Sequence, residues 1–361
     1  MRAYRPDWVL LLLPWVMFGA SVVFVHSASA VGEAGISWSS THAIRQALWM
    51  SFAFTIMMIS LRFSYRYLLD YAWFLYGLTI VLLLVVFFMP ARLGAHRWID
   101  LGFMNFQPSE LAKLAVPAAL AAFLKERQPG PMSFGRALVA VAIAAVPMLL
   151  ILKEPDLGTS LLFIPTTLAI LLLAGLRKKW ILIAVLAGAL VSPVLYHELK
   201  EYQKQRIQTF MNPYKDPLGA GYNIIQSRIA IGSGGLIGKG LFSGSQTQLE
   251  FLPERHTDFI FSVVTEEGGF VAGIAIILCY WTLIIRGLRT ADRCPHRFGK
   301  LLGVGIITLL GAQAVINIGM TMGLLPVVGM PLFIVSYGGS SLLTSLFMIG
   351  ILINIGMRRD L

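Results

Sequence analysis

The sequence predicts an all-α integral membrane protein, a polytopic bundle of about ten transmembrane helices. Of its 361 residues, 57% are hydrophobic and only 13% are charged, which is too few charges to cover the surface of a soluble domain. Apolar runs long enough to cross roughly 30 Å of hydrocarbon recur along the whole chain. We therefore expect residues 1–361 to form a single membrane domain.

The expected spans follow from these apolar runs in chain order. They cover residues 8–26, 43–61, 68–90, 110–124, 137–152, 157–175, 180–197, 258–285, 299–322 and 331–356. The first run is longer than the apolar part of a usual signal peptide, and further spans follow it. It is therefore expected to be a retained helix.

The basic residues of the termini and short connections test this pattern. Both termini and every second short connection together contain most of them: Arg2, Arg5, Arg62, Arg66, Lys125, Arg127, Arg136, Arg177, Lys178, Lys179, Arg286, Arg289, Arg293, Arg297, Lys300, Arg358 and Arg359. The opposite set contains only Arg92, Arg97 and Lys153. Lys and Arg concentrate in cytoplasmic loops, so both termini are predicted to be cytoplasmic. No basic face with interleaved aromatic residues is evident, so nucleic acid is not an expected partner.

Two connections on the opposite side are longer than the others. Residues 198–257, between the seventh and eighth spans, form a large predicted extracytoplasmic loop, and residues 91–109 form a smaller one. The large loop contains GSGGLIGKG, which departs from a phosphate-binding loop because Ser233 replaces its first glycine and Gly240 follows Lys239 where a hydroxyl is needed. Tight turns are the expected role, and a cradle for a lipid pyrophosphate is the alternative.

Three acidic residues, Glu110, Asp156 and Asp258, each begin a predicted span on the extracytoplasmic side. Placing an acid in the bilayer costs about 2.5–3.5 kcal/mol on insertion scales, so such residues suggest a functional site. If the three helices are neighbours, their first turns would form an anionic, water-accessible pocket.

Each acid also has a purely structural interpretation. Ser109 is a candidate N-cap of the fourth span. Glu110 and Lys113 are i,i+3 neighbours and can form an internal ion pair. Asp156 and Asp258 can each cap the helix that follows.

Cations and an aromatic residue are expected at the rim of this pocket, namely Arg45, His96, Arg97, Trp98, Arg255 and His256. A carboxylate beside a sugar hydroxyl can act as a general base. Arginine and lysine can hold the pyrophosphate of a leaving group. The combination favours glycosyl transfer between lipid-linked sugars over an ion pathway, which would need acids through the bilayer midplane.

Several long blocks resemble one known family. HRWIDLGFMNFQPSELAKLAVP, EPDLGTS, DPLGAGYNIIQSRIAIGSGGLIGKG, QLEFLPERHTDFIFSVVTEEGG and GLLPVVGMPLFIVSYGGSS are similar to the SEDS family of bacterial wall synthases. The run from Asp216 to Asp258 resembles its elongation members more than its division or sporulation members.

The resemblance implies a peptidoglycan glycosyltransferase that polymerises lipid II and inverts the donor linkage. It implies Asp258 as the catalytic general base. Glu110, Lys113 and Asp156 would line the same cavity, and Trp98 falls on an aromatic position associated with activity. A divalent cation, Mg²⁺ or Mn²⁺, is chemically reasonable beside the pyrophosphate, although no metal-ligand spacing requires it.

The resemblance also implies partners and a location. The expected partner is a class B penicillin-binding protein of the PBP2 type, within a complex of elongation proteins. The protein would lie in the bacterial inner membrane with its active site facing the periplasm. Two other functions remain open: a lipid II flippase that uses Glu266 and Glu267, and a non-catalytic scaffold for the penicillin-binding protein.

Overall fold

The computed structural model describes residues 6–29, 41–90, 96–100, 102, 105–126, 130–198, 201–219 and 221–358. Among the basic residues of the predicted loops, Arg2, Arg5, Arg92, Arg127 and Arg359 lie outside this described part.

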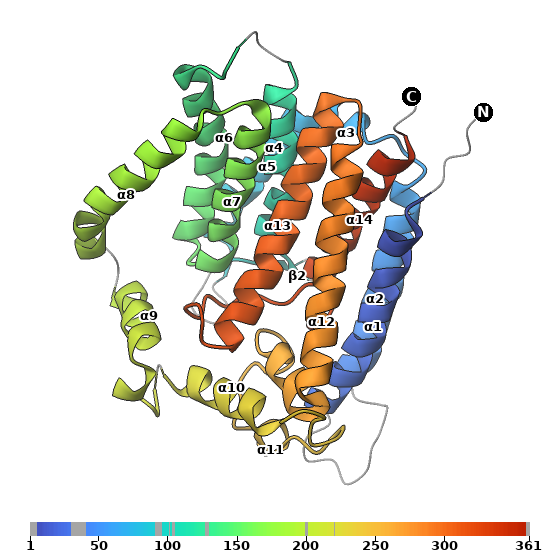
Figure 1. The fold of residues 1–361 in the computed structure, drawn as a ribbon, viewed down its shortest axis with the longest axis vertical. Helices are drawn as coiled ribbons and strands as arrows, with labels where there is room; N and C mark the ends of the chain where they lie inside the picture. Colours follow the sequence, from blue (N-terminus) through green and yellow to red (C-terminus); the bar gives the residue numbers. More distant parts are fainter. Residues whose placement is uncertain are drawn as a thin grey trace.

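Helices dominate the described chain (Figure 1). In order they are α1 (Trp8–Ser29), α2 (Thr41–Ser60), α3 (Tyr67–Asp70), α4 (Ala72–Val85), η1 (Val86–Phe88), α5 (Pro108–Leu124), α6 (Phe134–Lys153), α7 (Leu157–Ala174), α8 (Lys178–Glu198), α9 (Glu201–Met211), η2 (Pro213–Lys215), α10 (Tyr222–Ser233), α11 (Ser245–Gln248), α12 (Ile260–Asp292), α13 (Arg297–Thr321) and α14 (Gly339–Met357). Two short antiparallel strands, β1 (Ile99–Asp100) and β2 (Asn105–Phe106), pair in the 91–109 connection.

Within the described residues, six helices are long and apolar enough to cross a membrane, namely α1, α6, α7, α12, α13 and α14. The protein is therefore an all-helical, polytopic membrane protein. Every apolar range expected from the sequence overlaps a helix. The number of crossings, about ten, stays a prediction.

One expectation about these elements was wrong, and one element was not predicted. The tenth apolar range was expected to be helical from residue 331, but α14 begins only at Gly339. The main chain before it is bonded elsewhere, because the carbonyls of Met330 and Pro331 accept from α13 side chains and the Tyr337 N–H donates to the His256 carbonyl. The β1–β2 hairpin was also not expected.

Helix starts near the acidic residues follow local chemistry. Pro108 occupies the first turn of α5, where its missing N–H costs nothing. Gln107 is the N-cap residue there, so Ser109 is not the cap. Asp156 caps α7 as expected, because its Oδ1 accepts from the Thr159 N–H at 3.1 Å.

Helix α13 occupies the centre of the bundle and packs against α5, α7, α12 and α14. Small residues permit this close packing: a Cβ on Gly305 would lie 2.7 Å from Ile170 of α7 and 3.0 Å from Pro117 of α5. Helix α14 packs in turn against α2, and α1 against α12. Because α13 joins the early and late helices, the bundle has one core.

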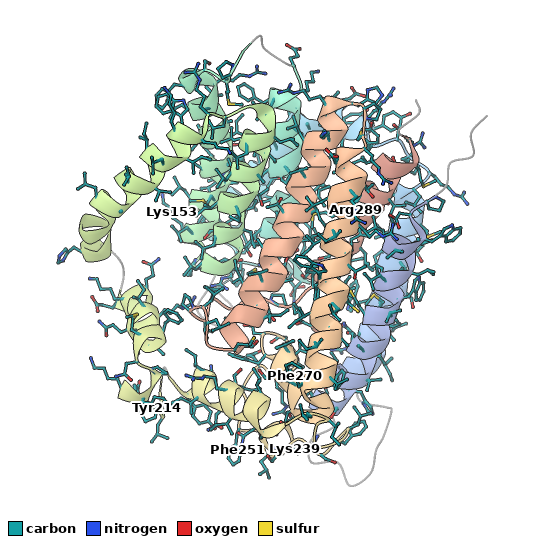
Figure 2. The ribbon with its side chains drawn as sticks, in the orientation of Figure 1. Lys153, Tyr214, Lys239, Phe251, Phe270 and Arg289 are labelled. Atoms are coloured by element: carbon teal, nitrogen blue, oxygen red, sulfur yellow. The ribbon has the colours of Figure 1, made fainter. Side chains whose placement is uncertain are left out.

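The two ends of the bundle differ (Figure 1). Helices α10 and α11 lie at one end, and α9 lies at the side of the bundle between α8 and α10; we call residues 201–251 the loop end. Helix α1 begins and α14 ends at the opposite end. Figure 2 shows Lys239 and Phe251 at the loop end and Arg289 towards the other end of α12.

Helix α12 is interrupted at Gly269, where φ is +70°. The glycine-rich segment of the loop end pairs with this break: the Phe270 N–H donates to the Gly235 carbonyl at 2.9 Å, and the Lys239 N–H to the Glu266 carbonyl at 3.0 Å. Gly235, Gly238 and Gly240 all have positive φ. Tight turns are therefore the observed role of this segment.

We predict that Gly269→Ala destabilises the fold by at least about 1–2 kcal/mol, because a left-handed residue with a Cβ is strained. That Cβ would also lie 2.3 Å from the Gly238 nitrogen. The matched control is Gly77→Ala in α4, where a Cβ has no neighbour within 4 Å. Thermal unfolding in detergent measures both variants, and equal midpoints would contradict the prediction.

Candidate active site

A cavity of about 1100 Å³ opens where α5 and α7 begin. Its walls come from α2, the first turns of α5 and α7, the hairpin segment, and the two loops that precede α12 and α14. The lining side chains that carry charge are Arg45, Arg97, Asp100, Glu110, Lys113, Asp156, Glu254 and Asp258. The cavity is therefore strongly polar, with acids and bases in contact with one space.

The structure brings most of the expected site residues to this one cavity. Asp258, Glu110, Lys113, Asp156, Trp98, Arg45 and Arg97 all line it. Arg255 does not, because its guanidinium donates to the Ala28 carbonyl at 2.7 Å and pairs with Glu250 at 3.0 Å. His96 and His256 do not line it either: a ring nitrogen of His96 contacts the Met89 carbonyl at 2.5 Å, and the His256 ring lies 5.9 Å from the ring of Tyr337, which does line the cavity.

Asp258 is held by its main chain rather than by its carboxylate. Its carbonyl accepts from the Asn317 side chain at 2.9 Å, and Phe259, not Asp258, is the N-cap residue of α12. Among the described residues, none donates a hydrogen bond to its carboxylate oxygens. Burial of the carboxylate, and then the negative charges of Glu254 and Asp156, raise the pKa of Asp258 from 3.8 to about 7, against the opposing charges of Arg97 and Arg206.

Glu110 and Lys113 form the expected ion pair. Both side chains are buried, and Lys113 Nζ lies 2.7 Å from Glu110 Oε1. Lys113 Nζ also donates to Gln313 Oε1 at 3.4 Å. The pair offsets part of the cost of burying either charge alone, and both residues still line the cavity.

Asp156 combines capping with contact to the cavity. While Oδ1 caps α7, Oδ2 accepts from Gln107 at 3.1 Å and from Ser109 at 3.4 Å. Both residues belong to the start of α5. This carboxylate therefore joins the first turns of α5 and α7 at the cavity wall.

Arg97 holds the connection between α6 and α7. Its Nε donates to the Glu154 carbonyl at 2.9 Å, and its terminal nitrogen donates to the Pro155 carbonyl. Burial and the Asp156 charge raise the pKa of the Glu154 carboxyl to about 8, and Arg97 lowers it. Arg97 is thus a fixed cation near Glu154 and Asp258, and its charge opposes the rise of both pKa values.

Several residues that shape the site were not singled out in the sequence. Arg206 on α9 lies close enough to influence the Asp258 charge, and no local pattern distinguishes it. Gln313 and Asn317 are polar residues one turn apart in an apolar span. Such intramembrane polar residues are a functional signal, and this signal could have identified them.

The donor set does not form a metal cluster. Within the described ranges, no group of three His, Cys, Asp or Glu side chains lies close enough to hold a metal ion. The expected divalent cation beside a pyrophosphate therefore stays a prediction, and no step below depends on it.

The bundle and its charged cavity define a polytopic membrane protein with an ionisable site. The chain belongs to the FtsW, RodA and SpoVE family, described as "Cell cycle protein", whose profile matches residues 8–361. It is 41% identical to peptidoglycan glycosyltransferase MrdB of Escherichia coli (strain K12), over 99% of this chain and 94% of that protein.

Two solved structures share the fold. One, described as "Structural coordination of polymerization and crosslinking by a peptidoglycan synthase complex", has a TM-score of 0.85 and 30% identity over 98% of both chains. The rod shape determining protein RodA of Thermus thermophilus has a TM-score of 0.73 and 28% identity, over 99% of this chain and 98% of that chain.

We predict that Lys113→Met lowers stability by about 3–5 kcal/mol, because it leaves the buried Glu110 carboxylate without its partner. The double variant Lys113→Met/Glu110→Gln should recover most of this loss. Lys204→Met is the control, since Lys204 and Glu201 form a more exposed i,i+3 pair at 3.3 Å worth about 0–1 kcal/mol. Thermal unfolding in detergent measures all three variants. A single variant as stable as the double one would disprove the argument.

Proposed function

We propose that this protein is a peptidoglycan glycosyltransferase that polymerises lipid II into glycan strands during cell elongation, with Asp258 as its general base. One observation carries the proposal: the Asp258 carboxylate faces the cavity with no hydrogen-bond donor among the described residues. A base must be free to accept a proton from its substrate, and a pKa near the working pH suits that task.

The proposed step is a displacement at C1 of the donor MurNAc. The ionised Asp258 takes the proton from the 4-hydroxyl of the acceptor GlcNAc, and that oxygen attacks C1 of the donor MurNAc. The bond between C1 and the pyrophosphate oxygen breaks, and undecaprenyl pyrophosphate leaves with the bonding electrons. An α-linked donor becomes a β-1,4 linkage, and Asp258 is left protonated.

The cations of the cavity would stabilise the charge that develops on the leaving pyrophosphate. Arg97 and Arg45 line the cavity, and the Lys113 charge is already neutralised in part by Glu110. We therefore assign pyrophosphate contact to the two arginines. Glu110, Lys113, Asp156 and Trp98 are assigned to the sugars and the wall around them.

An amphiphilic substrate also suits the side of the cavity formed by α2. Arg45, Leu48, Trp49 and Phe52 are spaced as one helix face, and all four line the cavity. Leu48 and Phe52 are exposed, as expected for side chains that face lipid. A cation followed by apolar residues matches a pyrophosphate followed by a polyprenyl chain.

The same proposal includes the membrane arrangement. Residues 1–361 form one domain with ten crossings, and residues 198–257 form an extracytoplasmic loop between the seventh and eighth. The loop end would face the periplasm and both termini the cytoplasm of a bacterial inner-membrane protein. The position of Arg289 towards the end opposite Lys239 (Figure 2) supports this orientation, because basic residues favour the cytoplasmic side.

We infer a crosslinking partner, a class B penicillin-binding protein of the PBP2 type, acting with other elongation proteins. The similarity to a chain of a peptidoglycan synthase complex that coordinates polymerization and crosslinking supports this inference. Polymerised strands are the substrate of a crosslinking enzyme, so the two activities belong together chemically.

A flippase would use Glu266 and Glu267, but both carboxylates are hydrogen-bonded within the protein, Glu266 to the loop end and Glu267 to α1. Glu266 accepts from the Lys239 ammonium at 2.8 Å and from the N–H groups of Gln246 and Thr247 at 2.9 and 3.2 Å. Glu267 accepts from the Ser27 hydroxyl at 2.5 Å. These contacts favour a structural role and so favour the synthase over the flippase.

We predict that Asp258→Asn lowers the polymerisation rate of purified protein by at least about 10²–10⁴-fold, because an amide cannot take the proton. Fluorescently labelled lipid II, with and without the partner, provides the substrate. Asp292→Asn is the control, because Asp292 is exposed and pairs only with Lys300 at 2.7 Å in the described structure. An Asp258→Asn protein with an unchanged rate would refute Asp258 as the general base, whereas a wild-type protein that makes no glycan under any of these conditions would favour the scaffold.

We also predict an acidic limb in the pH dependence of the rate. Asp258 acts as a base only when ionised, and its raised pKa of about 7 means that its active form is lost as the pH falls. The rate should fall about tenfold for each pH unit below 7. Polymerisation measured from pH 5.5 to 8.5, with folding followed by intrinsic fluorescence, tests this. A rate that stays flat while the protein remains folded would contradict it.

A further inference from the structure

Two buried amide side chains lie one turn apart on α13, on the face turned towards the cavity loops. Gln313 and Asn317 are both fully buried. Gln313 donates to the Pro331 carbonyl at 2.9 Å and accepts from Lys113 at 3.4 Å. Gln313 and Asn317 therefore form a buried polar strip on an otherwise apolar helix.

The Asn317 amide group makes two hydrogen bonds, and they join two walls of the cavity. Nδ2 donates to the Asp258 carbonyl at 2.9 Å and to the Met330 carbonyl at 2.6 Å. An amide nitrogen carries two hydrogens, so its donor capacity is fully used. Within the described part of the chain, Oδ1 has no partner. The side chain thus acts as a donor bridge between the two loops.

We propose that Asn317 is a positioning residue, which sets the location of the Asp258 carboxylate by joining its main-chain carbonyl to that of Met330. The inference rests on the proposed function. Asn317 does not line the cavity, so it acts through Asp258 and not on the substrate.

Neighbouring contacts explain why this bridge matters. The Tyr337 N–H donates to the His256 carbonyl at 2.9 Å, and the Ser336 hydroxyl donates to the Thr257 carbonyl at 2.6 Å. Asn317 supplies the corresponding contact for Asp258 itself. Without it Asp258, two residues before the start of α12, can turn, and a displacement of the reacting group by 1 Å can cost about 10²-fold in rate.

The loop that contains Met330 lies close to the Asp258 carboxylate, so the two Asn317 hydrogen bonds can set the distance between them. Gly329 has φ of +70°, and a Cβ at this position would lie 3.5 Å from Asp258 Oδ2. Gly329 and Pro331 flank Met330, and both line the cavity. Asn317 therefore fixes the separation between the proposed base and the wall that faces it.

Asn354 provides a control for substitution of Asn317. Asn354 on α14 is equally buried, and its Nδ2 donates to the carbonyls of Ser60, Leu61 and Phe63 at 3.2, 2.9 and 2.7 Å. It supports a non-helical connection after α2, away from the cavity. Asn317→Ala and Asn354→Ala remove the same chemical group from buried sites, and Asn354→Ala removes one contact more, because Asn354 Oδ1 also accepts from the Tyr65 N–H at 3.0 Å.

The test compares steady-state polymerisation of labelled lipid II by full-length Asn317→Ala and Asn354→Ala, at a temperature where both remain folded. We expect Asn317→Ala to lower kcat about 10–100-fold with KM within about threefold of wild type. Asn354→Ala should lower the unfolding temperature but leave kcat within about threefold. Asn317→Asp, which keeps the side-chain volume but can donate at most one hydrogen bond, is measured in parallel and should share the kcat loss.

Equal kcat in the Asn317 and Asn354 variants would overturn the proposal, as would a loss confined to KM. Asp258→Asn in the same series distinguishes failure of the Asn317 positioning role from failure of the proposed function. If Asp258→Asn is inactive while Asn317→Ala and Asn317→Asp keep full kcat, only the positioning role fails. If Asp258→Asn remains active, the proposed function itself fails.

Discussion

Non-helical backbone inside a membrane protein must find its hydrogen-bond partners within the protein, because hydrocarbon supplies none. The loops before α12 and α14 meet this constraint through side chains of neighbouring helices and of each other. The Asn317 side chain donates to the Asp258 and Met330 carbonyls, and the Ser336 hydroxyl donates to the Thr257 carbonyl. The main chain is thereby satisfied without using the Asp258 carboxylate. This arrangement leaves a free acid in a rigid wall, and the proposed chemistry depends on it.

Several other charged side chains of the cavity are engaged by an ion pair, a helix cap or main-chain carbonyls. Glu110 and Lys113 neutralise each other, Asp156 is engaged in capping α7, and Arg97 is held by two carbonyls. Asp258 differs because its charge is opposed by burial and by neighbouring acids. Its pKa of about 7 is the result. One cavity therefore holds several ionisable groups with different roles.

Much of the fold followed from the sequence because apolar length and local spacing determine it. The apolar ranges predicted the helices, the i,i+3 spacing predicted the Glu110–Lys113 pair, and the residue before α7 predicted the Asp156 cap. The start of α14 could not be predicted from composition, because the apolar residues before Gly339 bond to distant side chains instead of forming a helix. The roles of Arg255 and Asn317 escaped prediction for a similar reason, since each depends on a long-range contact.

The central claim is that the Asp258 side chain receives the proton of the acceptor sugar. The most direct measurement is a structure of the Asp258→Asn protein with lipid II bound in the cavity. The account predicts an acceptor 4-hydroxyl within about 2.6–3.2 Å of the residue 258 side chain, with the donor pyrophosphate beside the cavity arginines. Sugars bound outside the cavity, or an acceptor hydroxyl that instead contacts Asp156 or Glu110, would contradict it.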